Sequence, residues 1–355
     1  MAYHPSYVGK NLIETVDISP FTVETRDSIA DSERLRSGQT LVQALHTLGF
    51  VKVTGHGINK DEIQDALAWT KKLFDLPYED KMKAPHPPGR MPHRGYSGIG
   101  KEKVYSPADV EANRAAGNTP QELRKVSDFK ESYEIGSEHD PVQQNIWLPN
   151  DVLPNFRIRM TALYQRLLSV SDVLLKAISV GLGLNSQEHA ALAKLISGRH
   201  CQLRLLHYPA ISKDRLQNDL VARLPTHTDW GTFTIMFQDG GGGLELKNPK
   251  SQEFLHAEPE DGTFILNIGD MLQRFTNDYL VSAQHRVSVP KADTVPTVGI
   301  PARYSIPFFT APDFSHVVAT LPRFITNENP AKYEPVKFDE YGLSVSKHQY
   351  QEGEL

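Results

Sequence analysis

The chain has 355 residues, of which 39% are hydrophobic and 23% charged, as in ordinary globular proteins. Its net charge of -5 and the lack of a Lys- and Arg-rich run argue against a nucleic-acid partner. No window approaches 18 uninterrupted apolar residues and no signal-peptide pattern opens the chain, so we expect neither a membrane span nor secretion. Cys201 is the only cysteine, which excludes an internal disulfide and fits a cytoplasmic location. No pattern calls for an obligate protein partner.

The first third of the chain predicts a helical scaffold. The apolar residues of its first expected helix share one face, at Leu41, Val42, Leu45 and Leu48. Gly49 ends this helix, and a short β-rich strand follows at 50–54. Asn59 and Glu62 form a capping pair for a second helix, which ends before Pro77.

Loops are expected between this scaffold and one long helix. The stretch 84–104 is rich in Pro and Gly, which predicts a loop. The polar segment 106–127 predicts a surface excursion. Apolar residues then recur at helical spacing over 156–178, which predicts a long supporting helix that ends near Gly181.

After about residue 198, short β-rich segments dominate, and turn-forming residues separate them. Six strands are expected, at 201–209, 232–239, 243–248, 263–269, 285–289 and 303–309. The four glycines Gly240–Gly243 lack the Lys and Ser/Thr of a phosphate loop, and we interpret them as a hairpin turn. Strands at this spacing are typical of a sandwich or barrel, jelly rolls included, so the sequence predicts an α+β fold.

The segment HTDWGTFTIMFQD places His227 and Asp229 two residues apart. Side chains at positions i and i+2 of a strand lie on one face, roughly 7 Å apart, which suits one metal ion. With His285 from another strand they would form the two-His, one-carboxylate triad of non-haem Fe(II) oxygenases. A site of this kind also suits Zn²⁺. In the alternative without a metal, His227 is a capping residue and His285 has no role.

A second constellation suits a carboxylate ligand. Arg303 and Ser305 also lie two apart on one expected strand, and Tyr208 ends another. A guanidinium fork beside hydroxyl groups binds carboxylates well, and a buried Arg without an anionic partner is costly. The alternative is an ion pair between Arg303 and an Asp or Glu of the chain itself.

Longer segments resemble a known family. Those in the N-terminal part are VDISPF, GFVKVTGHGI and KLFDLPYEDKMK, those in the middle are RGYSGIGKEKV and FKESYEIG, and those in the C-terminal part are HTDWGTFTIMFQD, GGLEL, NIGDMLQRFTND, HRV and RYS. In order and spacing, and over nearly the whole chain, they resemble the isopenicillin-N-synthase-like family of Fe(II)- and 2-oxoglutarate-dependent dioxygenases. RGYSGIGKEKV, KESYEIG, LRLLHYPA and HTDWG carry a narrower resemblance to fungal thymine dioxygenase and to fungal secondary-metabolite oxygenases.

The resemblance implies a double-stranded β-helix, or jelly roll, at 151–355. It implies an N-terminal region with helices and a substrate lid at 1–150, the two parts forming one compact unit. Fe(II) would be bound by His227, Asp229 and His285. The distal carboxylate of 2-oxoglutarate would be held by Arg303, Ser305 and Tyr208. With O₂ at the remaining position, the enzyme would oxidise a C–H bond and release succinate and CO₂.

Two other functions remain open from the sequence. In an oxidase of the isopenicillin-synthase kind, Arg303 and Ser305 would hold the substrate's own carboxylate, and 2-oxoglutarate would not be used. A jelly-roll binding or metal-storage protein would have no turnover. Succinate release separates the first function from both alternatives.

Strand alternation and proximity to the ligands suggest Arg204, Trp230 and Phe309 as substrate-binding residues. A glycine-rich loop that could act as a lid adds Arg94 and Tyr96, and Asn267 is also expected to face the pocket. Arg204 could instead be a structural ion pair and Trp230 plain core, and the loop with Arg94 and Tyr96 could face solvent rather than act as a lid. An aromatic wall with one or two Arg suits a small flat ring that bears carbonyl groups. A pyrimidine base and an aromatic fungal metabolite both qualify.

Overall fold

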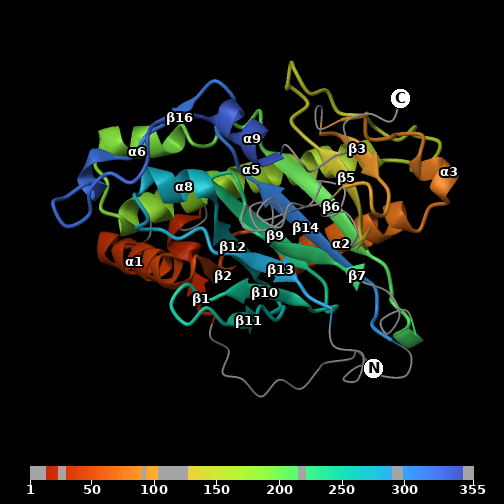
Figure 1. Cartoon of the computed structure of the whole chain (residues 1–355), viewed down its shortest axis with the longest axis horizontal. Coiled ribbons are helices and arrows are strands. Elements are labelled where there is room, and N and C mark those ends of the chain that lie inside the picture. Colours follow the sequence, from red (N-terminus) through yellow and green to blue (C-terminus); the bar gives the residue numbers. More distant parts are fainter. Residues whose placement is uncertain are drawn as a thin grey trace, which may run out of the picture.

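The computed structural model describes residues 13–22, 29–89, 93–102, 127–214, 221–289 and 299–346. In this part of the chain, two β-sheets lie beside a layer of helices (Figure 1). All six strands expected after residue 198 are present, and the long helix spans Phe156–Gly181. The surface excursion expected at 106–127 lies outside the described residues, except for Ser127. The mixed α and β composition is therefore as predicted.

The larger sheet has eight strands and contains both parts of the chain. Its order is β1 (Thr15–Asp17), β2 (Phe50–Thr54), β12 (Phe264–Ile268), β9 (Phe233–Gln238), β14 (Arg303–Phe309), β6 (Gln202–Tyr208), β5 (Glu131–Ile135) and β3 (Gly95–Ser97). Only β1 and β2 run parallel to each other; the other neighbours are antiparallel. Because strands from before residue 150 form both edges, the N-terminal and C-terminal regions share one sheet.

The smaller sheet faces the larger one. Its order is β11 (Phe254–His256), β10 (Leu244–Lys247), β13 (His285–Val287) and β8 (Leu224–His227). Two short pairs join β4 (Ser127–Asp128) to β7 (Val221–Ala222), and β15 (Val317–Val318) to β16 (Val336–Lys337). The hairpin expected at Gly240–Gly243 is wrong, because β9 and β10 belong to different sheets. These glycines carry the chain from one sheet to the other, and Gly242 and Gly243 do so with positive φ.

Most of the helices cover the other face of the large sheet (Figure 1). The helices are α1 (Asp31–Leu48), α2 (Lys60–Phe74), α3 (Tyr78–Lys81), α5 (Phe156–Gly181), α6 (Ser186–Ala193), α8 (Asp270–Phe275) and α9 (Phe338–Ser346), with 3-10 turns η1 (Ser19–Phe21) and η5 (Pro322–Phe324). Of these, α9 borders the space between the two sheets. Gly49 ends α1 at φ 71°, a left-handed conformation that glycine adopts without strain. The predicted capping box of Asn59 and Glu62 at the start of α2 is also present.

Two glycines let α1 and α5 approach each other closely. A Cβ on Gly181 would lie 2.1 Å from the carbonyl oxygen of Gly38, and a Cβ on Gly38 would lie 2.8 Å from that of Ala177. The missing side chains therefore fix how near the long helix lies to the first helix.

Strand alternation divides the large sheet into two chemically different faces. On β6, Leu203 and Leu205 belong to the core under the helices, whereas Leu206 and Tyr208 belong to the core between the two sheets. The same period places residues 303, 305, 307 and 309 of β14 toward the smaller sheet. The space between the sheets is the place where the expected functional residues gather.

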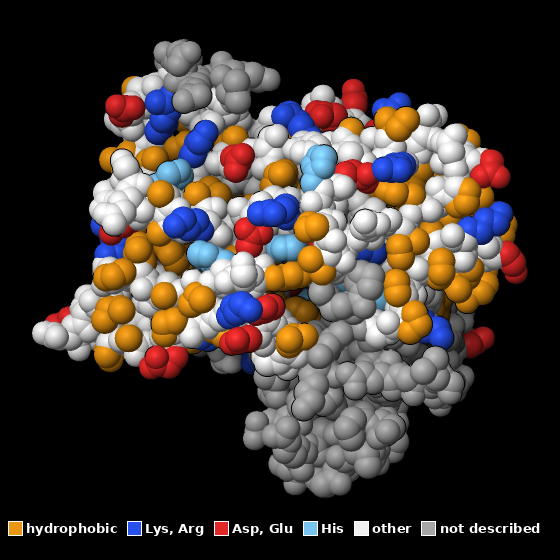
Figure 2. Space-filling view, turned by 90° about the horizontal axis from the view of Figure 1, so that it is seen from above, with side chains coloured by type: hydrophobic (Ala, Val, Ile, Leu, Met, Phe, Trp, Pro, Cys, Tyr) orange, Lys and Arg blue, Asp and Glu red, His pale blue; other side chains and the backbone are white. Residues whose placement is uncertain are grey.

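The outer surface carries side chains of mixed character. On the face drawn in Figure 2, hydrophobic side chains alternate with Lys, Arg, Asp and Glu, as on a solvated surface. Within the described ranges, every helix is too short or too polar to cross a membrane.

Candidate active site

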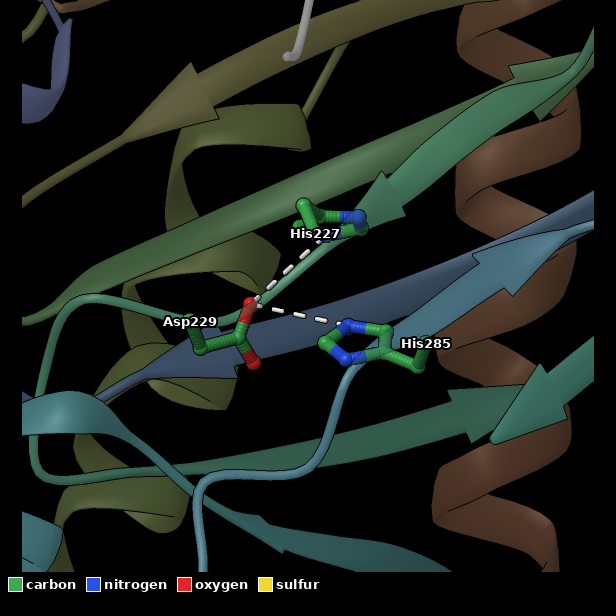
Figure 3. A group of neighbouring side chains, drawn as sticks. All are labelled: His227, Asp229 and His285. Carbon is green, nitrogen blue, oxygen red and sulfur yellow. Dashed lines mark ion pairs between the residues drawn. The ribbon is translucent and has the colours of Figure 1, made fainter. Parts of the chain in front are cut away.

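The predicted metal ligands meet between the two sheets (Figure 3). His227 ends β8, His285 begins β13, and the two residues are paired in the antiparallel register of the small sheet. Asp229 follows β8 by two residues, and its Oδ1 lies 3.8 Å from Nε2 of His227 and 3.7 Å from Nε2 of His285. One donor atom from each side chain lies within 4.8 Å of the others. The prediction that these three residues come together is confirmed.

Each of the three side chains has its other polar atom occupied by the protein. Nδ1 of His227 lies 2.8 Å from the carbonyl oxygen of Pro225, and Nδ1 of His285 lies 3.2 Å from that of Ala283. A proton on each Nδ1 therefore leaves both Nε2 atoms as lone-pair donors.

The carboxylate is held in a matching way. Oδ2 of Asp229 accepts hydrogen bonds from the hydroxyl of Thr234 at 2.6 Å and from the amide nitrogen of Asn267 at 2.7 Å. These two donors leave Oδ1 to face the histidines. Three ligand atoms thus converge on one point, with the orientation of each set by a second contact.

Burial and mutual charge tune this group toward metal binding. Burial and the neighbouring His285 lower the pKa of His227 to about 4, so its imidazole is neutral near pH 7. Burial alone would raise the pKa of Asp229, but His285, His227 and the two hydrogen bonds outweigh it, and the pKa is lowered. Two neutral imidazoles and one carboxylate are the protonation states in which these residues bind a divalent cation.

The residues fit a metal ion of the kind predicted. Two nitrogen donors and one oxygen donor on one side of the ion leave the opposite side open for substrates. A capping role for His227 does not explain the convergence of all three donor atoms. We therefore assign this group as the candidate metal centre.

The triad lies in the wall of a cavity of about 400 Å³. Strands from both sheets line it, and α9 adds Phe338, Asp339, Gly342 and Leu343. Of the residues predicted from the sequence, it contains His227, Asp229, His285, Arg303, Ser305, Tyr208, Arg204, Trp230, Phe309 and Asn267. The cavity thus contains the metal centre and the predicted anion-binding residues together.

Arg303 is completely buried at one end of this cavity. Its Nη1 donates to the hydroxyl of Ser305 and its Nη2 to Oε1 of Gln238, both at 2.9 Å. Its guanidinium carbon lies 5.1 Å from the ring centre of Tyr208. Within the described part of the chain Arg303 forms no ion pair, so the alternative of an Asp or Glu partner is not borne out. Sequence reasoning missed Gln238, although it shares a strand face with Thr234 and Met236, two residues that line the cavity.

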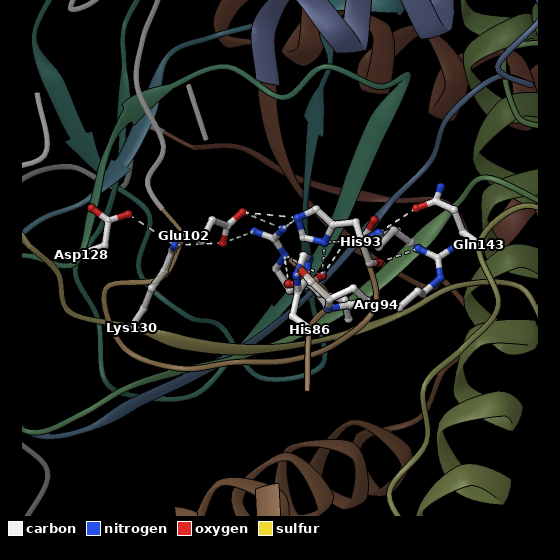
Figure 4. Close-up of polar contacts among 11 residues, drawn as sticks. His86, His93, Arg94, Glu102, Asp128, Lys130 and Gln143 are labelled. Atoms are coloured by element: carbon white, nitrogen blue, oxygen red, sulfur yellow. Dashed lines mark hydrogen bonds and ion pairs between the residues drawn. The ribbon is translucent and has the colours of Figure 1, made fainter. Parts of the chain in front are cut away.

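Arg204 lies in the cavity wall but also has partners of its own. Its Nε lies 2.8 Å from Oε1 of Glu134, and its Nη2 lies 3.0 Å from Oε1 of Glu102. Glu102 also accepts from Nζ of Lys130 at 3.0 Å and lies near His93 (Figure 4). Both interpretations of Arg204 therefore hold in part: it lines the cavity and it belongs to a structural ion-pair network.

The structure separates Arg94 and Tyr96 from the other candidates. Arg94 is buried below Gly136 and pairs with Asp140 at 3.2 Å. Tyr96 lies on β3, and its hydroxyl donates to Glu131 at 2.5 Å. Neither side chain lines the cavity in the described structure. Both side chains are buried, so these two residues do not form a lid. The prediction failed because the Pro- and Gly-rich sequence pattern did not reveal that β3 pairs with β5.

Three predicted substrate-binding residues line the cavity as expected, namely Asn267, Trp230 and Phe309. Asn267, however, contacts a metal ligand. The amide nitrogen of Asn267 is used by Asp229, so this residue positions a metal ligand. Strand alternation also places Gln202 inward on the face of β6 that carries Arg204, and the structure confirms this. The cavity wall contains further polar residues that sequence reasoning missed, namely Lys130, His93, Gln143 and His200.

A buried cavity with a two-His, one-carboxylate group and a buried Arg without an ion pair in the described residues is the arrangement expected of a non-haem iron oxygenase. Two family models match the chain: the N-terminal region of non-haem dioxygenases in morphine synthesis over residues 13–155, and the 2OG-Fe(II) oxygenase superfamily over residues 199–312. The chain belongs to the 2-oxoglutarate- and Fe(II)-dependent oxygenases. It is an oxidoreductase whose cofactors are Fe(II), 2-oxoglutarate and O₂.

Several fungal proteins are similar to this chain. The proline hydroxylase buaE of Petromyces alliaceus is 40% identical over 83% of this chain and 87% of its own length. The 2-oxoglutarate-Fe(II) type oxidoreductase ppzD of Metarhizium rileyi is 36% identical over 85% of this chain and 82% of its own. A full-length Neurospora crassa protein, crystallised in complex with alpha-KG and thymine, has a TM-score of 0.78 at 30% identity, covering 95% of this chain and 96% of that one.

Proposed function

We propose that this enzyme oxidises a C–H bond of a small, ring-bearing molecule and releases succinate and CO₂. The observation that carries the proposal is the layout of the cavity. Arg303 and Phe309 lie at opposite ends of β14, Arg204 lies near Phe309, and the triad lines the same cavity as all three. A cosubstrate and a substrate can therefore both reach one metal ion.

Each group of residues has a separate task in this proposal. His227, Asp229 and His285 hold Fe(II), which, with bound 2-oxoglutarate, supplies the activation of O₂. Arg303 and Ser305 hold the distal carboxylate of 2-oxoglutarate, and the phenol of Tyr208 faces the same end of the cavity. Burial between the sheets excludes bulk water from the reacting atoms.

The wall away from Arg303 favours a ring with polar substituents. Trp230, Phe309 and Phe314 provide aromatic surface, and Arg204 lies with its guanidinium carbon 5.6 Å from the ring centre of Phe309. The relatives named above include a proline hydroxylase and a protein bound to thymine, both of which concern small rings. We propose that the substrate is a small ring-bearing molecule of one of two kinds. It is either a fungal secondary metabolite, or the precursor of one, or else it is a pyrimidine base.

The finer features of the fold and setting are proposals of the same kind. We infer that the strands of 151–355 in the two facing sheets form a double-stranded β-helix, and that 1–150 form an N-terminal region whose strands extend the larger sheet. We also infer that the enzyme works in the cytoplasm on a free small molecule, without nucleic acid, a membrane or an obligate protein partner.

The test is a succinate-release screen with the Fe(II)-loaded protein, 2-oxoglutarate and O₂. The candidate substrates are nucleobases, amino acids including L-proline, and aromatic fungal metabolites. A compound of one class that raises succinate release and is itself oxidised in equal amount identifies the substrate. Oxygen uptake on a substrate without any 2-oxoglutarate would contradict the proposal and indicate the isopenicillin-synthase kind of oxidase.

A further inference from the structure

A second arginine lies beside the anion-binding end of the cavity. Arg223 immediately precedes β8, and only 2% of its surface is exposed. Its Nη2 donates to the carbonyl oxygen of Pro301 at 2.5 Å, and Pro301 lies two residues before Arg303. Its guanidinium carbon is 5.9 Å from the ring centre of Tyr208, the same ring that Arg303 approaches to 5.1 Å. The two arginines therefore share one aromatic neighbour.

The chain itself balances the positive charge of this pair only in part, because the nearby carboxylate of Asp239 favours the charged form of Arg223 without forming an ion pair with it in the described residues. In the ranges that the structure describes, neither Arg223 nor Arg303 forms an ion pair. The Nε atoms of both are buried and lack a hydrogen-bond partner. Burial and the positive charge of Arg303 lower the pKa of Arg223 to about 10, a value at which it still carries its charge near pH 7. Two buried like charges with one nearby carboxylate are unfavourable in the unliganded protein, because one negative charge does not offset two positive ones.

Contacts within the chain leave part of the Arg223 guanidinium without compensation. It faces one aromatic ring and donates one hydrogen bond to a backbone carbonyl, and its buried Nε has no hydrogen-bond partner among the described residues. Taking a guanidinium out of water is costly unless its donors are satisfied and its charge is paired. An anion bound beside Arg303 would offset that cost, because Coulomb attraction in a buried site is only partly screened.

We infer that Arg223 is a positioning residue for 2-oxoglutarate, acting through Tyr208 and through its charge on the carboxylate that Arg303 holds. The inference rests on the proposed role of the Arg303 end of the cavity. It makes this end doubly cationic, and so selective for 2-oxo acids with a second carboxylate. Arg223 does not line the cavity itself, so the effect is electrostatic and orienting rather than a direct contact.

The experiment is a calorimetric titration of the Fe(II)-loaded full chain without oxygen. The two ligands are 2-oxoglutarate and 2-oxovalerate, which keeps the 2-oxo acid group and lacks the distal carboxylate. Arg223→Met should weaken 2-oxoglutarate binding roughly 10-fold, as expected for one charge about 12 Å from the carboxylate under an effective dielectric constant near 20. It should leave 2-oxovalerate binding unchanged, and Arg223→Lys should retain most of the 2-oxoglutarate affinity.

Stability and a control variant separate this role from a structural one. Because Arg303 repels Arg223, the unliganded Arg223→Met protein should melt at the same temperature as the wild type or higher. If Arg223→Met binds 2-oxoglutarate as tightly as the wild type, or loses affinity for both ligands equally, the inference is overturned. If Arg223→Met fails to fold, Arg223→Gln replaces it in the same titrations. Arg303→Met is the reference: if it too leaves 2-oxoglutarate affinity unchanged, the proposed cosubstrate site itself is wrong.

Discussion

Residues around the metal centre are arranged in two layers. His227, His285 and Asp229 offer the donor atoms, and Pro225, Ala283, Thr234 and Asn267 fix how those atoms point. Partners of this second kind orient a ligand and reduce the conformational freedom that metal binding would otherwise remove. Their loss should therefore weaken metal affinity without removing any ligand.

Asn267→Leu tests this second layer. The change deletes the amide donor to Asp229 Oδ2 and keeps side-chain size, while Thr234 still holds the same oxygen. We expect Fe(II) affinity to fall by roughly 10- to 100-fold. An anaerobic Fe(II) titration measures the effect. Exposed Asn327, changed to Leu, is the control, and equal Fe(II) affinity in both variants would show that Asn267 does not position the ligand.

Arg204→Met tests whether the cavity-lining Arg binds substrate or only supports the wall. Loss of the charge leaves Glu134 and Glu102 without one shared partner, although Lys130 still pairs with Glu102. If Arg204 contacts the substrate, as we propose, the variant should lose substrate binding and keep substrate-independent release of succinate from 2-oxoglutarate. A lower melting temperature with parallel loss of both reactions would make Arg204 purely structural.

Much of this residue-level site could be predicted from the sequence, because strand alternation is a local property. The i, i+2 spacing correctly placed His227 with Asp229 and Arg303 with Ser305. Glu102 and Glu134 could not be paired with Arg204 in this way, since the contacts join residues about 100 and 70 positions apart. Such pairs depend on the tertiary fold.

At the scale of elements, the C-terminal helix α9 covers part of the cavity. The hydroxyl of Tyr341 donates to Oδ2 of Asp270 at 2.6 Å, and Asp270 also accepts from Ser282 and Thr228. The backbone N–H of Asp270 donates to the carbonyl oxygen of Asp229 at 2.8 Å. The helix is thus fastened to the segment that carries a metal ligand.

Tyr341→Phe should loosen α9 without altering the metal centre. The variant loses one hydrogen bond, worth about 1 kcal/mol, and Asp270 keeps its other two donors. We expect faster hydrogen exchange in residues 338–346 and a higher substrate KM, with unchanged Fe(II) affinity. Tyr279→Phe is the matched control: its ring stacks on His46 outside α9, so hydrogen exchange in residues 338–346 should stay as in the wild type. Equal exchange rates in wild type and Tyr341→Phe would mean that this bond does not hold the helix.

The elements themselves were only partly predictable. Hydrophobic periodicity located α5 and the six later strands, because each buries one face. It did not show that β9 and β10 enter different sheets, and it missed β3, whose Gly95–Ser97 segment lies in a Pro- and Gly-rich stretch. Strand pairing decides both features, and a local pattern does not contain it.

At the scale of the whole molecule, buried ion pairs join the N-terminal elements to the later strands. Glu131 on β5 accepts from Lys81 of α3 at 2.9 Å, from Tyr96 of β3 at 2.5 Å, and contacts Nδ1 of His207 on β6 at 2.7 Å. Three elements therefore meet on one carboxylate. Burial alone would raise its pKa, but these three partners outweigh burial, and the pKa of Glu131 is lowered.

Glu131→Gln should destabilise the chain in a pH-dependent way. At pH 7 the loss of the charge leaves Lys81 buried without its partner, at a cost of about 3–5 kcal/mol. Because the folded-state pKa is lowered, the stabilisation from Glu131 is fully present above its unfolded pKa of about 4.3. It is lost as the pH falls through the lower folded value.

Urea unfolding of the wild type and Glu131→Gln from pH 7 downward measures this difference. The gap between their free energies of unfolding should be widest above about pH 5 and should shrink in more acidic solution. Glu14→Gln, at an exposed position, is the control, and its free energy of unfolding should equal that of the wild type at neutral and at acidic pH. A gap for Glu131→Gln that stays constant down to about pH 2 would contradict the ionic role of Glu131.

The central claim is that His227, Asp229 and His285 hold the iron that converts 2-oxoglutarate and O₂ to succinate. The most direct measurement is succinate formation from 2-oxoglutarate by the Fe(II)-supplied wild type and by Asp229→Ala, with circular dichroism confirming that both are folded. We predict 2-oxoglutarate-dependent succinate release by the wild type and none by the variant. Wild-type rates of succinate release from folded Asp229→Ala would contradict the claim.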